Sequence, residues 1–283
     1  MAEILRGEAA AEGIMRDLTA RAEKLLARGI CPCLAILRVG ERPSDMAYER
    51  AAVKRCGSLG IRTKYIRLAS DCAQSELEAA IRGINADDTV HGCLMFRPLP
   101  KHLNEGAACE VLSPEKDVDG MTALSLTGVF IERGGGFPPC TAQSCMELLD
   151  HYGIDPAGKN VTVIGRSLVI GRPLSMLLLS RNASVTICHS RSAELPEICR
   201  RADILVAAAG KPDLVGPDFV HPDQVVVDVG INPRTDGGIC GDVQYDAVAP
   251  LVRAISPVPG GVGSVTAAVL VKHVIEAAER SAR

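Results

Sequence analysis

Apolar residues in the first half of the chain alternate between helical spacing and short continuous runs. Helical spacing predicts helices over residues 8–28 and 74–85, and continuous apolar runs predict buried strands over 33–39, 61–68 and 90–96. Strands that alternate with helices form right-handed crossover units, which place the strands parallel to one another in one sheet. The first half is therefore expected to be an α/β unit.

The segment between the first two predicted strands carries start and stop signals for another helix. Pro43 is followed by Ser44 and Asp45, and we expect Ser44 or Asp45 as the N-cap because short polar side chains accept hydrogen bonds from the first turn. The helix is expected to run to about Leu59 and to end at Gly60, since glycine commonly follows the last helical turn.

The second half repeats the pattern with shorter strands. Apolar runs predict strands over 161–165, 184–188, 204–208 and 225–229, with helices between them and a last helix over 265–280. Four such strands predict a doubly wound sheet of the nucleotide-binding type, whose ligands bind at the carboxyl ends of the strands. The segment 132–139 contains three glycines and two prolines, so we place the domain boundary there.

Composition excludes several classes of protein. The 283 residues carry a net charge of −3, which leaves no electrostatic footprint for a nucleic acid. No uncharged apolar stretch is long enough to span a membrane, and the acidic N-terminus does not resemble a signal peptide. The 11 cysteines are odd in number and form no C-x-x-C pair, so we expect reduced, mostly buried thiols in a cytoplasmic protein without a metal site.

The first strand of the second half leads into a turn that contains two glycines. Gly165 lets the turn fold tightly, and Gly171 is expected to let the backbone approach a ligand beside a helix N-terminus, which suits a pyrophosphate. The spacing is not G-x-G-x-x-G, so an ordinary strand–helix turn remains an alternative. No acid follows the next strand. Ser190 and Arg166 could instead bind a 2′-phosphate, which favours NADP over NAD.

Several motifs follow one another in a fixed order across nearly the whole chain. They are Lys116-Asp-Val-Asp-Gly120, Pro139-Cys-Thr141, Gly165-Arg-Ser with Gly171-Arg-Pro173, Ala209-Gly-Lys-Pro212, Val227-Asp-Val-Gly-Ile-Asn232, Gly241-Asp-Val243 and Pro257-Val-Pro-Gly-Gly-Val-Gly263. In this combination the chain resembles the bifunctional methylenetetrahydrofolate dehydrogenase/methenyltetrahydrofolate cyclohydrolase family of one-carbon metabolism.

The resemblance implies a two-domain α/β fold and a homodimer. Residues 1–137 and 265–283 would form an N-terminal α/β catalytic domain that binds folate, and residues 138–264 a C-terminal Rossmann-type domain that binds NADP, with a cleft between them. The implied reactions are the NADP-dependent oxidation of 5,10-methylenetetrahydrofolate to 5,10-methenyltetrahydrofolate and its hydrolysis to 10-formyltetrahydrofolate.

The resemblance also implies the site residues. Tyr48 and Asp119 would be catalytic and would bind the substrate, with the Asp119 carboxylate accepting hydrogen bonds from the pterin; without the family, Asp119 would be read as a turn acid. The side-chain-poor loop would approach the flat ligand, although a plain interdomain loop is the alternative. Its implied substrate contacts are Pro259, Gly260 and Gly261, and the implied cofactor contacts are Gly165, Arg166, Ser167, Ser190 and Ile231.

Two positions depart from the family's pattern. The family reads Tyr-x-x-x-Lys where this chain has Tyr48 followed by Ala52, and Gln-Leu-Pro-Leu-Pro where this chain begins Phe96-Arg97. Lys54 lies about 200° around the helix axis from position 52, so it should point away from the cleft. Alternation along a strand would turn Arg97 away from the face of Phe96, unless a local rearrangement presents it.

The two departures weaken the hydrolytic half of the implied activity. The family's Lys and Gln assist water and proton transfers, whereas Ala52 and Phe96 transfer no proton. Hydride transfer mainly needs positioning. The leading hypothesis is therefore the dehydrogenase. The alternatives are a relative acting on another one-carbon or pterin substrate, and a weakly catalytic protein that binds folate and NADP.

Overall fold

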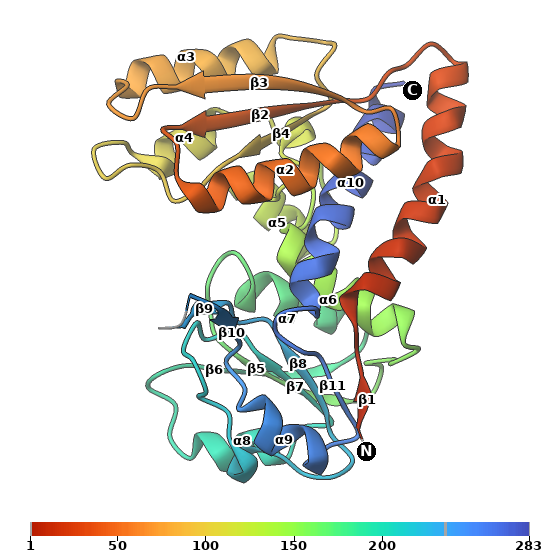
Figure 1. Cartoon of the computed structure of the whole chain (residues 1–283), viewed down its shortest axis with the longest axis vertical. Helices are drawn as coiled ribbons and strands as arrows, with labels where there is room; N and C mark the ends of the chain where they lie inside the picture. Colours follow the sequence, from red (N-terminus) through yellow and green to blue (C-terminus); the bar gives the residue numbers. More distant parts are fainter. Residues whose placement is uncertain (1, 235–236, 283) are drawn as a thin grey trace. The chain divides into compact units, whose positions relative to one another are not determined.

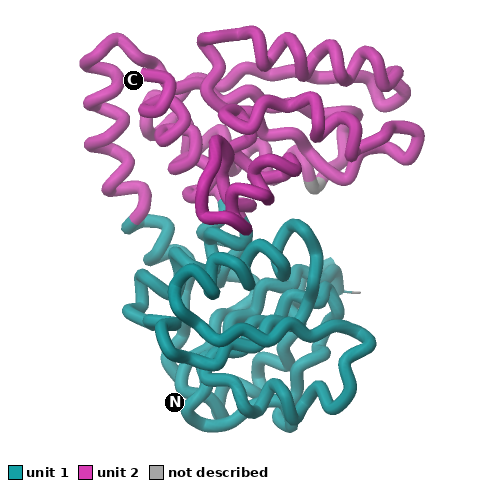
Figure 2. The backbone as a smooth tube through the Cα atoms, turned by 180° about the vertical axis from the view of Figure 1, so that it is seen from behind, with its two compact units in different colours: residues 1–13, 141–266 teal, residues 14–140, 267–283 magenta. Residues whose placement is uncertain are grey.

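The computed structural model describes residues 2–234 and 237–282, and the chain divides into two compact units (Figure 2). Unit 1 consists of residues 1–13 and 141–266, and unit 2 of residues 14–140 and 267–283. Both units are α/β, as predicted. Three helices continue from one unit into the other; they are α1 (Gly7–Ala27), α6 (Cys140–His151) and α10 (Val262–Ser281).

Unit 2 is built on a three-stranded parallel sheet with the order β3-β2-β4 (Figure 1). The predicted strands are present as β2 (Cys33–Val39), β3 (Arg62–Leu68) and β4 (Gly92–Met95). Every residue of the central strand β2 is buried, and alternate residues of β2 pack in a core with Leu77 and Ile81 of α3. The helices and the single 3-10 turn of this unit are α2 (Pro43–Ser58), α3 (Gln74–Asn85), α4 (Glu105–Val111), η1 (Pro114–Lys116) and α5 (Ala123–Ile131).

Helix α2 begins earlier than the sequence suggested. Arg42 is the N-cap and Pro43 occupies the first turn, so the predicted cap at Ser44 or Asp45 is wrong. Proline has the fixed φ of a first helical residue and needs no N–H partner there. The Asp45 carboxylate instead forms an ion pair with Arg42 at 2.8 Å. The predicted end is confirmed, because Gly60 follows α2 in the left-handed region with φ 69°.

Unit 1 contains a six-stranded sheet with the order β1-β11-β8-β7-β5-β6, and all its strand pairs are parallel. The four predicted strands are β5 (Asn160–Ile164), β6 (Ser184–Cys188), β7 (Ile204–Ala207) and β8 (Val225–Asp228). The strands β1 and β11 were not predicted, since two residues are too few to show a period. The elements that complete the unit are β1 (Glu3–Ile4), β11 (Ala254–Ile255), the hairpin of β9 (Asn232–Pro233) and β10 (Ile239–Cys240), the helices α7 (Gly171–Ser180), α8 (Leu195–Arg200) and α9 (Tyr245–Val248), and the turns η2 (Pro217–Phe219) and η3 (Ala249–Leu251).

Two buried carboxylates hold the loops at the carboxyl edge of this sheet. Asp242 accepts hydrogen bonds from the backbone N–H groups of residues 209–211 at 2.6–2.9 Å and from the Asn232 amide at 2.9 Å. Asp228 accepts from the backbone N–H groups of Asp242 and Val243, both at 3.0 Å. Three of the motifs that carry the family resemblance therefore form one polar scaffold beneath the edge where ligands of such sheets bind.

We expect the change Asp242→Ala to lower the free energy of unfolding by about 2–3 kcal/mol, because it leaves three backbone N–H groups without their charged acceptor. Chemical denaturation of the protein, monitored by far-UV circular dichroism, measures the change. Asp223→Ala is the matched control, since Asp223 is exposed. Equal stability of the two variants would contradict the structural role assigned to Asp242.

The cysteines match the prediction of buried thiols. All 11 lie within the described residues as free thiols, and each except Cys31 is buried. Over residues 2–234 and 237–282, none of the helices combines the length and the apolarity needed to cross a membrane.

Candidate functional site

The motif over residues 116–120 contains three charged side chains, two of which form hydrogen bonds with the backbone. Lys116 Nζ donates to three carbonyl oxygens within residues 84–87 at 2.7–2.9 Å and so closes the end of α3. The fully buried Asp117 accepts from the backbone N–H groups of residues 121–122 at 2.7–3.0 Å. Asp119 takes no part in this scaffold, which makes it the member of the motif available to a ligand.

The Asp119 carboxylate has limited contact with water. Its side chain is 23% exposed, and its Oδ2 is 3.8 Å from Arg97 Nη2. Burial raises the pKa of Asp119 to about 6, the charge of Arg97 opposes that rise, and the Cys140 thiol is hydrogen-bonded to the carboxylate. At neutral pH Asp119 is therefore mostly ionised and acts only as a hydrogen-bond acceptor.

Arg97 is presented to Asp119, as the alternative of a local rearrangement allowed. Strand β4 ends at Met95, and Phe96 adds one last ladder hydrogen bond, from its N–H to the Leu37 carbonyl at 3.0 Å. Because Arg97 lies beyond the strand, alternation no longer decides where its side chain points. Its guanidinium lies between Asp119 and Glu105 at 3.8 and 3.7 Å.

Tyr48 and Ala52 lie on one face of α2, and Phe96 follows strand β4 and contacts that face through Tyr48. The rings of Tyr48 and Phe96 meet edge to face, with centroids 6.1 Å apart and an interplanar angle of 86°. Ala52 lies one helical turn after Tyr48 and is fully buried, whereas Lys54 is exposed, as expected. Burial raises the pKa of the Tyr48 phenol well above its ordinary value, so Tyr48 can donate a hydrogen bond.

An ion pair between β2 and α2 was not predicted from the sequence. Arg38 of β2 is 4% exposed, and its Nε lies 3.6 Å from Oε2 of Glu49 on α2. Arg67 of β3 reaches the other oxygen of Glu49, also at 3.6 Å. Within the described part of the chain, Arg38 Nε and Nη1 and Glu49 Oε2 have no hydrogen-bond partner. An arginine inside an otherwise apolar strand run was the one signal for this pair.

The glycine turn after β5 is tight, as predicted. Gly165 has φ 128°, and a Cβ there would collide with the Ala208 carbonyl. A Cβ on Gly171 would collide with the Gly165 carbonyl, so packing within the turn already requires glycine at position 171, and its approach to a ligand stays a prediction. Arg166 and Ser167 are exposed between them, at the carboxyl end of β5.

The other predicted contact residues of unit 1 also follow the strands. Ser190 is exposed after β6, and Ile231 is 62% exposed after β8. In the loop after β11, Pro259 and Gly260 are exposed but Gly261 is buried. The exposed residues are thus free to meet a ligand at the carboxyl edge of the sheet, whereas Gly261 packs within the protein.

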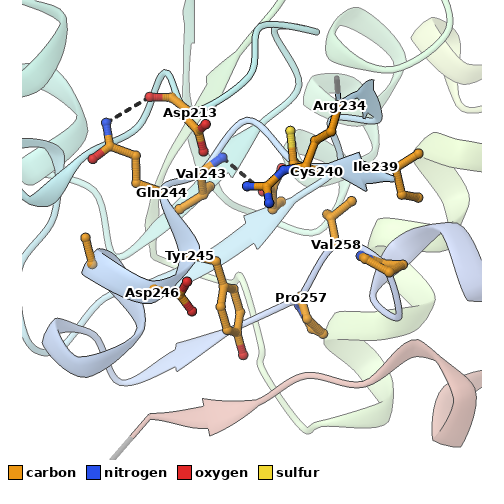
Figure 3. Close-up of a pocket in the computed structure, with 14 residues that line it drawn as sticks. Asp213, Arg234, Ile239, Cys240, Val243, Gln244, Tyr245, Asp246, Pro257 and Val258 are labelled. Carbon is orange, nitrogen blue, oxygen red and sulfur yellow. Dashed lines mark hydrogen bonds between the residues drawn. The ribbon is translucent and has the colours of Figure 1, made fainter. Parts of the chain in front are cut away.

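Unit 1 also contains a cavity of about 500 Å³ beside the β9–β10 hairpin (Figure 3). Arg234 and Ile239 of the hairpin segment line it, together with Tyr245 of α9 and Pro257 and Val258 of the loop after β11. Neither Arg166 nor Ser190 is among its lining residues. In the part of the chain that the structure describes, no group of three His, Cys, Asp or Glu residues could hold a metal ion.

Comparison with known proteins relates both halves of the chain to one family. The catalytic domain of tetrahydrofolate dehydrogenase/cyclohydrolase matches residues 5–119, and the NAD(P)-binding domain of the same family matches residues 139–282. The bifunctional protein FolD of Carboxydothermus hydrogenoformans is 50% identical over 281 residues, which are 99% of this chain and 98% of the relative. FolD of Clostridium botulinum is 46% identical over 99% of this chain and its own full length.

Solved structures agree with this relation. The bifunctional FolD enzyme of Campylobacter jejuni superposes with a TM-score of 0.96 at 36% identity, over 99% of both chains. The Trypanosoma brucei methylenetetrahydrofolate dehydrogenase-cyclohydrolase, solved with NADP and an inhibitor, has a TM-score of 0.94 at 34% identity, over 100% of this chain and 99% of its own. The chain therefore belongs to the tetrahydrofolate dehydrogenase/cyclohydrolase family.

Proposed function

We propose that this protein acts in one-carbon metabolism chiefly as an NADP-dependent methylenetetrahydrofolate dehydrogenase. It oxidises 5,10-methylenetetrahydrofolate to 5,10-methenyltetrahydrofolate. The observation that carries the proposal is the state of Asp119, an ionised carboxylate whose side chain is 23% exposed. The pterin ring offers adjacent amino and ring N–H donors, which an acceptor-only carboxylate is suited to bind.

Tyr48 is the second proposed substrate contact in unit 2. Its phenol is protonated at neutral pH and lies against Phe96, so it offers one hydrogen-bond donor beside a flat apolar surface. A ligand ring held by Asp119 and packed against such a surface would be fixed in orientation, which is what hydride transfer requires of the protein. Contacts of the substrate with Pro259, Gly260 and Gly261 stay a prediction.

NADP fits the exposed residues at the carboxyl edge of the sheet in unit 1. Arg166 and Ser190 are exposed after two adjacent strands, β5 and β6, and can share a 2′-phosphate through charge-assisted hydrogen bonds. Ser167 and the backbone at Gly165 are proposed to hold the pyrophosphate near the N-terminus of α7, and Ile231 to pack against the nicotinamide half. When bound, NADP supplies the hydride acceptor.

We expect Arg166→Ala to raise the KM for NADP by roughly 10- to 100-fold and to leave the KM for NAD nearly unchanged, because only NADP carries the phosphate that Arg166 would bind. Steady-state kinetics with each cofactor at saturating substrate measures both constants. Arg253→Ala, which removes an exposed arginine at the other end of the sheet, is the control. A parallel rise for NAD and NADP would contradict the assignment of Arg166.

The hydrolytic half of the family's activity lacks its usual acid–base pair in this chain. Ala52 and Phe96 stand where the family has Lys and Gln, and both side chains are buried and apolar. Any hydrolysis of methenyltetrahydrofolate by this protein must therefore use other groups, of which Tyr48 and Arg97 lie in the same region.

The overall proposal is tested by following NADPH formation with purified protein and 5,10-methylenetetrahydrofolate. Turnover supports the dehydrogenase. Binding of NADP and tetrahydrofolate without turnover would identify a weakly catalytic binding protein, and failure to bind tetrahydrofolate would indicate a different one-carbon or pterin substrate.

We further propose that the protein is a cytoplasmic homodimer that binds neither nucleic acid nor membrane. The buried free thiols suit a reducing compartment, and the net charge of −3 gives no general attraction for phosphate backbones. Light scattering coupled to gel filtration tests the dimer, because a mass near that of one 29.9 kDa chain would exclude it.

A further inference from the structure

Arg97 lies between two carboxylates that belong to different segments of unit 2. Its Nη1 is 3.7 Å from Glu105 Oε1, and its Nη2 is 3.8 Å from Asp119 Oδ2. The Arg97 side chain is 22% exposed, so the guanidinium is largely removed from water. Opposite charges at this separation attract one another more strongly in a shielded recess than on an open surface.

The Glu105 carboxylate is held in place by its own contacts, and it in turn restrains the Arg97 guanidinium beside it. It is the first residue of α4, where a negative charge is favoured by the helix dipole. Its Oε2 accepts the Leu99 N–H at 2.9 Å, so the carboxylate ties the start of α4 to the segment that carries Arg97. One nitrogen of Arg97 thus faces an anchored carboxylate, and the other faces Asp119.

The remaining groups around Asp119 do not supply a positive charge. Burial keeps the Cys140 and Tyr48 side chains neutral by raising the pKa of each, and Asp117 adds a negative charge. Among the described residues, Arg97 is the cation that forms an ion pair with Asp119. The ionisable groups that face Asp119 or its neighbours are Arg97, Glu105, Asp117, Tyr48, Cys93, Cys109, Cys140 and His273, together with Arg55, whose charge acts on Tyr48.

We propose that Arg97 is a positioning residue that keeps Asp119 ionised and turned toward the pterin, and that it thereby sets the lowest pH at which the protein binds folate. The inference rests on the proposed function, because it takes Asp119 to be the pterin's acceptor.

The direction of the pH effect follows from the charges. Desolvation already raises the pKa of Asp119 to about 6, and Arg97 opposes the rise. Loss of Arg97 would raise this pKa further, by about one or two units for an arginine beside a carboxylate. Folate affinity, which needs the ionised form, should then fall at a higher pH than in the unmodified protein.

The experiment is isothermal titration calorimetry of tetrahydrofolate, from about pH 5.5 to pH 9, with unmodified protein and with Arg97→Leu and Arg97→Lys. We expect Arg97→Leu to move the midpoint of the affinity loss upward by about one to two pH units, which weakens binding roughly 5- to 50-fold at pH 6. Above about pH 9 the two proteins should converge. Arg97→Lys should keep the midpoint close to that of the unmodified protein, because lysine retains the positive charge.

Arg16→Leu is the matched control, since it removes an exposed arginine of α1 with the same change in net charge. Tighter folate binding by Arg97→Leu would show that Arg97 merely blocks Asp119, and an unchanged midpoint would show that it does not affect ionisation; either result overturns the inference. Asp119→Asn separates this from the proposed function. If Asp119→Asn leaves the affinity of the unmodified protein intact, the pterin role of Asp119 itself is wrong.

Discussion

Methenyltetrahydrofolate supplied to this protein should be hydrolysed little faster than in buffer, while methylenetetrahydrofolate is oxidised with NADP at a readily measured rate. A positioned acid–base group contributes about 10²- to 10⁴-fold to such a proton transfer. Ala52 and Phe96 transfer no proton, and both side chains are buried. The Tyr48 ring packs edge to face with the Phe96 ring. The two half-reactions, assayed separately, should therefore differ in how much the protein accelerates them.

The double change Ala52→Lys with Phe96→Gln should raise hydrolysis, by about 10²-fold and at most about 10⁴-fold. The lower figure is favoured because Arg38 and Arg67 already lie beside α2, each 3.6 Å from Glu49. A new ammonium group one turn beyond Tyr48 would be repelled by both arginines, and the Glu49 carboxylate that could attract it is already paired. Ala52→Lys alone should do little, since it would lack a polar partner beside Phe96.

The matched control is Ala51→Lys with Phe96→Gln, because Ala51 is exposed and places the same charge on the outer side of α2. A comparable gain in the control would mean that net charge, and not a positioned group, assists hydrolysis. Efficient hydrolysis by the unmodified protein would contradict the premise, and Arg97→Leu and Tyr48→Phe would then identify the group that replaces the missing pair.

Periodic elements could be predicted from the sequence almost residue by residue. The predicted helix over 74–85 coincides with α3 (Gln74–Asn85), and the predicted strand over 33–39 with β2 (Cys33–Val39). Both have enough residues for a hydrophobic period to be read. The strands β1 and β11 have two residues each and join the sheet through partners distant in sequence, which no local pattern reports.

The site was harder to predict because its geometry depends on where strands stop. Strand alternation applies only as far as Met95, so it gave no information on Arg97, two residues further on. The partnership of Arg97 with Glu105 and Asp119 joins three segments and leaves no trace in spacing. The packing of Gly171 also leaves no trace in spacing, because its neighbour is the carbonyl of another turn residue, Gly165.

Asp119 was identified as a site residue through the family resemblance, because hydrophobic spacing and turn signals do not show which side chains bind a ligand. From spacing alone it is one of two acids in a turn, and the structure separates the two by their partners. The Asp117 carboxylate accepts hydrogen bonds from backbone N–H groups, whereas Asp119 is paired with the side chain of Arg97. This difference predicts different results for the two positions, since loss of Asp117 should reduce stability and loss of Asp119 should reduce folate binding.

Asp119→Ala should weaken tetrahydrofolate binding by about 100-fold at pH 7.5, because it removes an acceptor of charge-assisted hydrogen bonds worth about 3 kcal/mol in total. The thermal stability should change little, since no backbone N–H group of residues 2–234 and 237–282 donates to the Asp119 carboxylate. NADP affinity should stay within about twofold, because the proposed NADP contacts all belong to unit 1 and Asp119 belongs to unit 2. Titration calorimetry with each ligand measures both constants on one preparation.

Asp71→Ala, which removes an exposed acid of unit 2, controls for the change in net charge. The pH profile gives a second readout. In the unmodified protein folate affinity should be lost as the pH falls through about 6, where Asp119 takes up its proton, and in Asp119→Ala that loss should disappear. If the affinities for NADP and folate instead fell together while the fold stayed intact, Asp119 would be acting on the protein as a whole, and the pterin's acceptor would have to be sought elsewhere.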